Sequence, residues 1–329
     1  MAKTVRVVVT GATGQVAYAL LPRIAAGAMF GPGVEVDLRL ADIAPVIEKA
    51  TGVVMELEDG AFPALARVSA SADRAETHRD ADWVLLVGSV PRGPGMERGD
   101  LIRKNGPIFV EEGKAIAAYA SKNVRVVVVG NPCNTNCLIA RHAAGATVPD
   151  DRWTALTRLD QNRARSLLAA KAGARVGEVK KLAIWGNHSA TLFPDFTNAL
   201  VGGKKATDVI DRAWLETEFI PAVQQRGAAV IAARGASSAF SAAQAVVNHV
   251  RGLVDPTPDD DWASLAVISD GSYGVAKGIV SSFPCRSKGG GAFEIVQGIT
   301  LDGFAQTKID GTIAELERER EIVKDLLAS

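Results

Sequence analysis

Residues 5–17 read VRVVVTGATGQVA and carry the strongest structural signal in the chain. The first five residues form an apolar run typical of a buried strand, and a helical pattern over 15–26 follows a turn with two glycines. In this order, a glycine turn lets the backbone approach a pyrophosphate at a helix N-terminus. The spacing is G-x-x-G-x-x-A, where Ala17 takes the place of a third glycine that packs helix against strand. A tight turn without a ligand is the alternative.

The residues that follow continue this alternation of strands and helices. We predict further strands at 34–41, 82–87 and 124–129, and helices at 46–58 and 106–121. Strands that alternate with helices indicate a parallel sheet covered on both faces. The predicted fold class is therefore α/β, with a Rossmann-type doubly wound parallel sheet in the first half of the chain.

The pattern changes near residue 150 and becomes less regular. We predict helices at 160–173, 219–251 and 309–327, and strands at 179–185, 266–269, 278–283 and 293–296. The expected organisation is a nucleotide-binding Rossmann domain, residues 1–153, followed by an α+β substrate-binding and catalytic domain, residues 154–329.

Composition and charge argue against several classes of protein. The 329 residues include 37 Lys and Arg and 37 Asp and Glu, which removes the basic footprint of a nucleic-acid binder and of a polybasic membrane anchor. The apolar runs are far shorter than the roughly 18 residues of a membrane span. Because the N-terminus runs directly into the first strand, we expect no signal peptide and a cytoplasmic location. Cys133, Cys137 and Cys285 lack zinc or redox spacing, so we expect reduced, buried thiols and no metal site.

Asp42 ends the predicted strand 34–41. At that position a carboxylate can accept hydrogen bonds from the ribose hydroxyls of NAD. No arginine follows at 43–45 to receive the 2′-phosphate of NADP, so we predict NAD as the cofactor. A plain cap of the strand end is the alternative for Asp42.

Only one of the four histidines has a position that suggests chemistry. His188 follows the strand 179–185 within Gly-Asn-His-Ser, where an open α/β sheet places its ligands, although position alone leaves a structural role equally open. We predict that His78, in a polar stretch, is solvated, and that His142 and His249 are structural.

Asp160 and Arg163 lie three residues apart and therefore on one face of a predicted helix. They form either a simple intrahelical ion pair or part of a catalytic site. In the second interpretation the carboxylate orients a histidine and the guanidinium binds a substrate carboxylate in bidentate fashion.

A loop at 91–99 carries Arg92 and Arg98 among glycines and prolines, which suits a mobile lid, with a solvated loop as the alternative. Together with Arg163, these arginines suggest a substrate with two carboxylates. Tyr273 and Lys277 imitate the Tyr-x-x-x-Lys pair of short-chain dehydrogenases, but they lie in a glycine-rich turn, and we predict a structural role for Tyr273.

Taken together, these motifs resemble the cytosolic-type NAD-dependent malate dehydrogenases of the lactate/malate dehydrogenase superfamily. The resemblance covers essentially the whole chain and is carried by segments 11–17, 90–98, 130–136, 159–163, 185–189 and 270–274. Residues that depart from the common family pattern are Gly60, Glu112, Gln161 and Phe240.

The resemblance implies a catalytic role for each polar residue of the site. His188 would be the proton acceptor and Asp160 its orienting partner. The carboxylate beside the reacting carbon would be held by Arg163, the carbonyl would be polarised by Arg98, and the distal carboxylate would be bound by Arg92. Two further substrate contacts are implied at Asn131 and Ser241.

The resemblance also implies contacts with NAD, assembly as a homodimer, and a role in the tricarboxylic acid cycle. The implied cofactor-binding residues are Gly11, Ala12, Thr13, Gly14, Gln15, Val16, Ala17, Asp42, Asn105, Glu112, Val129, Gly130 and Asn131. Two other functions stay open at this point: a lactate-type 2-hydroxy-acid dehydrogenase, and a non-catalytic NAD(H)-binding protein.

Overall fold

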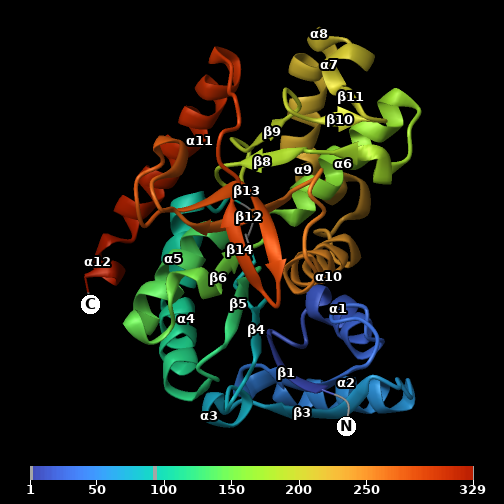
Figure 1. Ribbon diagram of the computed structural model, residues 1–329. Helices are drawn as coiled ribbons and strands as arrows, with labels where there is room; N and C mark the ends of the chain where they lie inside the picture. The colour runs from blue at the N-terminus through green and yellow to red at the C-terminus, as the bar shows by residue number, and fades with distance from the viewer. Residues whose placement is uncertain (1–2, 92–94, 329) are drawn as a thin grey trace. The chain divides into compact units, whose positions relative to one another are not determined.

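The computed structural model describes residues 3–91 and 95–328 (Figure 1). The chain divides into two compact units, and each is built from separate segments. The first unit comprises the residues up to 155, 239–251 and those from 319, and the second comprises 156–238 and 252–318.

The first unit contains six parallel strands in the order β3-β2-β1-β4-β5-β6. Their bounds are β1 Lys3–Thr10, β2 Val34–Ala41, β3 Leu65–Ser71, β4 Trp83–Leu86, β5 Arg125–Val128 and β6 Trp153–Ala155. The chain starts at β1 near the middle of this row and winds outward in both directions. This order confirms the predicted doubly wound sheet. Two strands were not predicted: β3, in which no residue is fully buried, and β6, which has only three residues.

Helices alternate with the strands of the first unit up to β6. They are α1 Gln15–Ala25, α2 Ile47–Asp59, α3 Arg74–Thr77, α4 Arg98–Tyr119 and α5 Cys133–Ala144, and of these α3 and α5 were not predicted. Most of α10 Phe240–Val254, together with α12 Lys324–Leu327, joins this unit from later in the chain. The predicted start of α4 at residue 106 was wrong. The helix begins eight residues earlier, where the side chain of Asp100 accepts a hydrogen bond from the backbone N–H of Glu97 at 3.3 Å, and it continues through Pro107.

The second unit is a mixture of helices and short antiparallel strands. Its strands are β7 Val179–Lys180, β8 Ala183–Trp185, β9 Phe193–Asp195, β10 Leu200–Val201, β11 Lys204–Lys205, β12 Ala263–Ile268, β13 Val280–Gly289 and β14 Ala292–Ile295. Its helices are α6 Arg158–Ala172, α7 Ala206–Val209, α8 Arg212–Trp214, α9 Ile220–Arg234 and most of α11 Gly303–Ile322.

Three predicted elements of the second half were wrong in detail. The strand 179–185 is two strands in different sheets, separated at Lys181, whose φ is +52°. The long helix 219–251 is broken after Arg234, because Gly235 adopts the left-handed conformation that ends α9. The terminal helix starts at residue 303, six residues before its predicted start, and α12 follows the end of α11.

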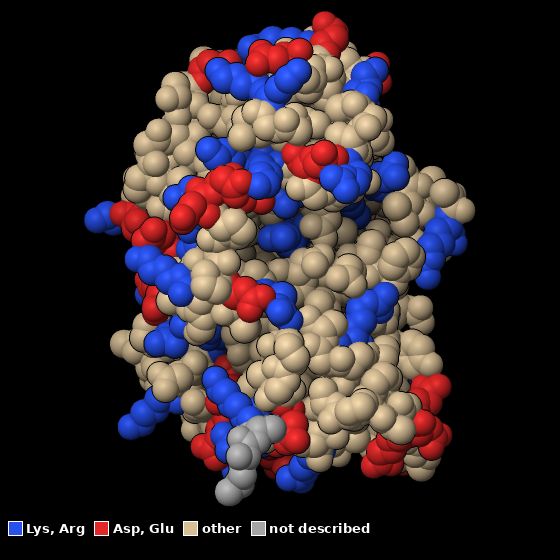
Figure 2. All heavy atoms as spheres, turned by 45° about the vertical axis from the view of Figure 1, so that its right-hand side comes forward, with Lys and Arg blue, Asp and Glu red and all other residues tan. Residues whose placement is uncertain are grey.

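Buried apolar side chains and thiols fill the interiors of the units. Cys133, Cys137 and Cys285 are buried and form no disulfide bond, as predicted, and burial raises the pKa of Cys137 and of Cys285. Tyr273 donates a hydrogen bond to the carbonyl of Val296 at 2.6 Å, which supports its structural role. Within residues 3–91 and 95–328, no helix is long and apolar enough to cross a membrane. On the face drawn in Figure 2, basic and acidic side chains lie beside one another over much of the surface.

Candidate active site

His188 and Asp160 form the central pair of the second unit. His188 follows β8, and Asp160 lies in the first turn of α6. His188 Nδ1 lies 2.5 Å from Asp160 Oδ2, and the Asp160 side chain is only 1% exposed, whereas that of His188 is 20% exposed. A buried carboxylate on Nδ1 fixes the tautomer and orientation of the ring and makes Nε2 the basic nitrogen. This geometry suits reversible proton transfer.

Arg163 joins this pair from one turn further along α6. Its Nη1 lies 3.3 Å from Asp160 Oδ1, and its Nη2 donates a hydrogen bond to Ser238 Oγ at 3.2 Å. The intrahelical ion pair that the sequence suggests is therefore present, and the same carboxylate also serves the histidine. The structure thus brings together three of the predicted site residues, His188, Asp160 and Arg163, within one unit.

Gln161 aligns the helix and the strand that carry this pair. Its Nε2 donates to the carbonyl of Leu182 at 2.8 Å, and its Oε1 accepts from the N–H of Ser264 at 3.0 Å. The side chain is fully buried. Gln161 therefore ties α6 to the segment that enters β8 and to β12, a role that sequence analysis missed because these partners are distant in the chain.

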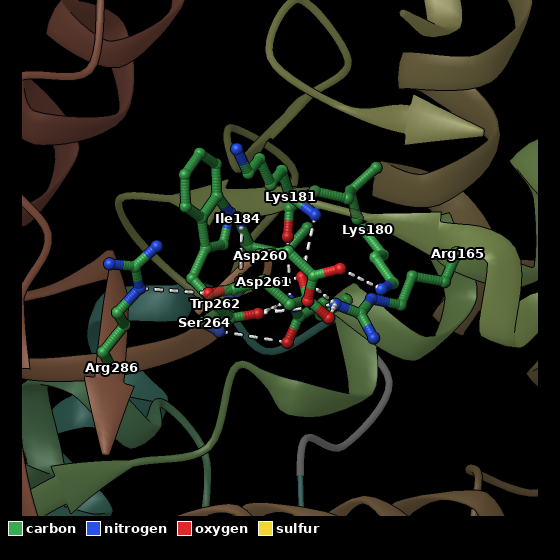
Figure 3. A network of polar contacts seen from close by, with 11 residues as sticks. Arg165, Lys180, Lys181, Ile184, Asp260, Asp261, Trp262, Ser264 and Arg286 are labelled. Carbon is green, nitrogen blue, oxygen red and sulfur yellow. Dashed lines mark hydrogen bonds and ion pairs between the residues drawn. The ribbon is translucent and has the colours of Figure 1, made fainter. Parts of the chain in front are cut away.

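A second polar cluster fixes the start of β8 (Figure 3). Asp261 accepts hydrogen bonds from Arg165 Nη2 at 2.7 and 2.9 Å, from the N–H of Lys181 at 2.8 Å and from the N–H of Trp262 at 2.9 Å. In addition, Ser264 Oγ accepts from the N–H of Ile184 at 2.9 Å. The strand that leads to His188 is therefore held by several hydrogen bonds before the chain reaches the site.

The glycine segment of the first unit has the geometry of an anion-binding turn. Gly11 has a φ of +63°, and a Cβ there would lie 2.5 Å from the Cα of Gly88, so a larger residue does not fit. Among the described residues, no side chain caps the N-terminus of α1, whose N-cap residue is Gly14. Because the first N–H groups of a helix need partners, this N-terminus fits a pyrophosphate. The structure thus supports a nucleotide cofactor.

Asp42 closes this turn at the end of β2. Its Oδ2 accepts hydrogen bonds from the N–H of Thr13 at 2.9 Å and from Thr13 Oγ1 at 2.8 Å, and its Oδ1 accepts from the N–H of Ile43 at 2.9 Å. The carboxylate therefore acts as a cap between β2 and the glycine turn. A contact between Asp42 and ribose stays a prediction.

Asn105 connects the ends of two neighbouring strands. It is buried on α4, where it accepts from the N–H of Val90 at 2.8 Å and donates to the carbonyl of Asn131 at 3.0 Å. Val129 is half-buried, Gly130 is buried, and Asn131 is exposed, and these three residues follow β5. Asn105 thus shapes the backbone that we expect to face the cofactor.

Glu112 lies in a buried ion-pair cluster. Its Oε1 lies 2.7 Å from Arg74 Nε, and its Oε2 lies 3.2 Å from His78 Nε2. Burial alone would raise the pKa of Glu112, but the contacts with His78 and Arg74 outweigh it and hold that pKa below its ordinary value. The prediction that His78 is solvated was wrong, because its side chain is fully buried against Glu112.

The remaining predicted residues lie at the starts of two helices. Arg98 begins α4, and its Nε lies 2.5 Å from Oε1 of Glu319, whose carboxylate also accepts a hydrogen bond from Thr135. Ser241 is half-buried near the start of α10. Arg92 lies outside the described residues. Among the residues that the structure does describe, no group of three or more His, Cys, Asp and Glu side chains could hold a metal ion.

Two family models match the chain over most of its length. The NAD-binding domain of lactate/malate dehydrogenase matches residues 5–150, and the alpha/beta C-terminal domain of lactate/malate dehydrogenase matches residues 157–326. The chain belongs to the lactate/malate dehydrogenase family. Its first half is the NAD-binding domain of this family, which confirms both the resemblance and the predicted cofactor.

Individual members of the lactate/malate dehydrogenase family are similar over nearly the whole chain. A malate dehydrogenase from Magnetococcus marinus is 53% identical over 328 residues, which are 99% of each protein. The crystal structure of a malate dehydrogenase from Naegleria fowleri is 40% identical, with a TM-score of 0.94 over 99% of both chains. A Trichomonas vaginalis lactate dehydrogenase in complex with NADH and oxamate is 35% identical, with a TM-score of 0.94 over 98% of this chain and 99% of the other.

Proposed function

We propose that this protein is an NAD-dependent malate dehydrogenase that interconverts (S)-malate and oxaloacetate. The observation that carries the proposal is the 2.5 Å contact between Asp160 and His188, with Arg163 on the same carboxylate. A histidine held in this way suits a proton acceptor and donor, and an adjacent arginine suits a carboxylate substrate. The 53% identity to a malate dehydrogenase over the whole chain supports the same reaction.

His188 is the proton acceptor in malate oxidation. Bound NAD supplies the acceptor for the hydride that leaves C2. As the C2–H and O–H bonds break and the carbonyl forms, His188 Nε2 takes the hydroxyl proton and becomes an imidazolium. The buried carboxylate of Asp160 stabilises that charge. In the reverse direction the imidazolium returns the proton to the oxygen of oxaloacetate.

Three arginines recognise the substrate in this proposal. The carboxylate beside C2 is bound by Arg163, the developing charge on the C2 oxygen is stabilised by Arg98, and the distal carboxylate is bound by Arg92. Asn131 and Ser241 complete the substrate contacts. Within this family a lactate-type activity is the second candidate, since one of the similar structures is a lactate dehydrogenase. Arg92 favours malate, because a monocarboxylate leaves its charge unpaired.

The proposed NAD site lies in the NAD-binding domain, residues 1–153, and the catalytic domain spans 154–329. The backbone of the glycine turn binds the pyrophosphate at the start of α1, and Asp42 binds the ribose. The full set of proposed cofactor contacts is Gly11, Ala12, Thr13, Gly14, Gln15, Val16, Ala17, Asp42, Asn105, Glu112, Val129, Gly130 and Asn131.

The test follows NADH absorbance with purified protein and different substrates. We expect rapid oxidation of NADH with oxaloacetate, and with pyruvate a kcat/KM lower by about 10- to 150-fold, the factor that corresponds to 1.5–3 kcal/mol for a lost hydrogen bond to a charged group. NADPH should be the poorer reductant.

The matched variant is His188→Asn, which should lower kcat by about 10²–10⁴-fold while NADH binding is retained. Higher efficiency with pyruvate than with oxaloacetate would contradict the assignment of Arg92. Binding of NADH without turnover of either substrate would favour a binding protein.

We further propose a cytoplasmic homodimer that serves the tricarboxylic acid cycle. The Ala-, Gly- and Ser-rich stretch 227–245 includes the exposed apolar side chains of Ile231 and Phe240, of which Phe240 is 70% exposed. Small residues allow close approach of helices, and burial of exposed apolar side chains in an interface between subunits is favourable. Light scattering after size-exclusion chromatography measures the mass, and a value near 34.5 kDa would contradict the dimer.

A further inference from the structure

One carboxylate oxygen of helix α11 accepts several hydrogen bonds from the loop that carries His188. Glu315 Oε2 accepts hydrogen bonds from Asn187 Nδ2 at 2.9 Å, from Thr191 Oγ1 at 2.7 Å and from Ser189 Oγ. Asn187 and Ser189 are the two neighbours of His188 in sequence. Glu315 therefore binds the side chains of both sequence neighbours of His188.

Thr312, one turn earlier on α11, adds a second contact to the same loop. Its Oγ1 accepts a hydrogen bond from the N–H of Asn187 at 2.9 Å. Gly186 has a φ of +85°, and a Cβ there would lie 2.0 Å from Thr312 Cγ2. The loop is thus pressed directly against the helix, and only glycine fits at residue 186.

The backbone before His188 is fixed from β13 as well. Gly186 and Ser282 exchange two backbone hydrogen bonds, at 3.1 and 2.8 Å. The imidazole ring is held separately, by Asp160. Two anchors therefore act on different parts of His188: Asp160 sets the orientation of the ring, and Glu315 with Thr312 sets the position of the backbone from which the ring projects.

A carboxylate is well suited to this position. An ionised carboxylate is an acceptor only and can take several donors, and its hydrogen bonds are stronger than those of a neutral amide oxygen. Two hydroxyl groups and one amide converge on Glu315 Oε2. A glutamine of the same shape would offer a weaker acceptor oxygen and an amide group that adds two donors among them.

We propose that Glu315 is a positioning residue for the catalytic base His188. This inference rests on the proposed dehydrogenase function, because it assigns Glu315 a role in proton transfer at Nε2. Proton transfer requires a heavy-atom separation of about 2.6–3.2 Å, and a displacement of about 1 Å can cost about 10²-fold in rate. Release of the loop from α11 permits such a displacement even though Asp160 is intact.

The experiment compares Glu315→Ala and Glu315→Gln with Glu317→Gln, a matched control on the exposed face of the same helix. We expect Glu315→Ala to lower kcat with oxaloacetate by about 10²-fold. We expect Glu315→Gln to lower it by about 10-fold, because the three donors are retained but the acceptor is weaker. Glu317→Gln should match the wild type.

Two further measurements separate positioning from general damage. NADH binding, followed by fluorescence titration, should be unchanged in the Glu315 variants, because the proposed NAD contacts belong to the first unit. The primary kinetic isotope effect with NADH deuterated at the transferred position should rise, since the step at C2 becomes rate-limiting. If Glu315→Ala does not fold, Glu315→Gln, which preserves the shape of the side chain, decides the test.

Several outcomes would overturn the proposal. If the wild type oxidises NADH with oxaloacetate and both Glu315 variants stay within twofold of its kcat, Glu315 does not position His188, and the proposed function is unaffected. Loss of kcat with weakened NADH binding and an unchanged isotope effect also overturns positioning, because it indicates a structural defect. A wild type without turnover of oxaloacetate overturns the proposed function, and the inference falls with it.

Discussion

At the scale of single residues, Glu112 is a buried carboxylate, and contacts with its neighbours offset the cost of burying its charge. Its side chain is 9% exposed, and it contacts the exposed guanidinium of Arg74 and the buried ring of His78. Because the pKa of Glu112 lies below its ordinary value, the ionised carboxylate favours the folded state. This contribution is present above the unfolded pKa of about 4.3 and is lost as the pH falls through the folded pKa.

Glu112→Gln should therefore destabilise the protein at neutral pH and less so in acid. We expect a loss of about 1.5–3 kcal/mol in the free energy of unfolding at pH 7.5, typical of a hydrogen bond to a charged group. The difference from wild type should shrink as the pH falls below about 4.3. Urea denaturation across this pH range measures it.

The control is Glu111→Gln, since Glu111 is the exposed neighbour on α4 that pairs with Lys114 at 3.2 Å. Exposed pairs contribute about 0–1 kcal/mol. Equal effects of the two substitutions at every pH would show that the buried cluster contributes nothing particular to stability.

Residue types and spacing predicted Asp160, Arg163 and His188, because a histidine after a strand and a charged pair on one helix face are visible in the sequence. The partners of these residues were not predictable. Gln161, Thr312 and Glu315 act through contacts with residues 21 to 128 positions away. His78 was misjudged for the same reason, since its polar neighbours in sequence say nothing about Glu112, which buries it.

At the scale of elements, the packing of α4 on α5 depends on a glycine. A Cβ at Gly113 would lie 2.2 Å from the carbonyl oxygen of Ala140 and 3.0 Å from the Cβ of Ala143. Both obstacles belong to a helix rather than to a flexible side chain. We therefore expect Gly113→Ala to force α4 and α5 apart at a cost of about 1–3 kcal/mol in the free energy of unfolding.

Gly52→Ala is the matched control, because Gly52 lies in α2 and, apart from its chain neighbours and the backbone of its own helix, no described atom lies within 4 Å of the added Cβ. Here alanine should stabilise the protein by about 0.5–1 kcal/mol through helix propensity. Chemical denaturation of both variants should give opposite signs. Stabilisation by both substitutions would show that the two helices readily accommodate the methyl group.

The elements that the sequence predicted best are the strands β1, β4 and β5, because their apolar runs leave few alternatives, and β2, in which apolar and polar residues alternate. Elements that depend on distant partners were missed. The strand β3 lacks such a run, and the division of 179–185 into β7 and β8 depends on pairing with two different strands. The early start of α4 was not predicted because Gly99, Gly106 and Pro107, which are typical of loops, lie inside this helix.

At the scale of the whole molecule, neither unit is a continuous stretch of chain. Three segments form the first unit and two form the second, and because they alternate, the chain passes between the units four times, after residues 155, 238, 251 and 318. The first unit therefore cannot fold completely from the N-terminal half alone. Each unit is completed only when the chain returns to it, so we expect a single cooperative transition in calorimetry.

Binding of NADH should shift the whole unfolding transition to higher temperature. A ligand that binds only the folded state stabilises it by about 2.7 kcal/mol at a concentration of 100 times its Kd. The proposed contacts lie in the first unit, so a shift of the entire transition would indicate that the four crossings of the chain couple the unfolding of the two units. NADPH at the same concentration should have a smaller effect, because in the proposed site the carboxylate of Asp42 would repel a 2′-phosphate. Two transitions, of which NADH moves only one, would show instead that the units unfold independently despite the four crossings of the chain.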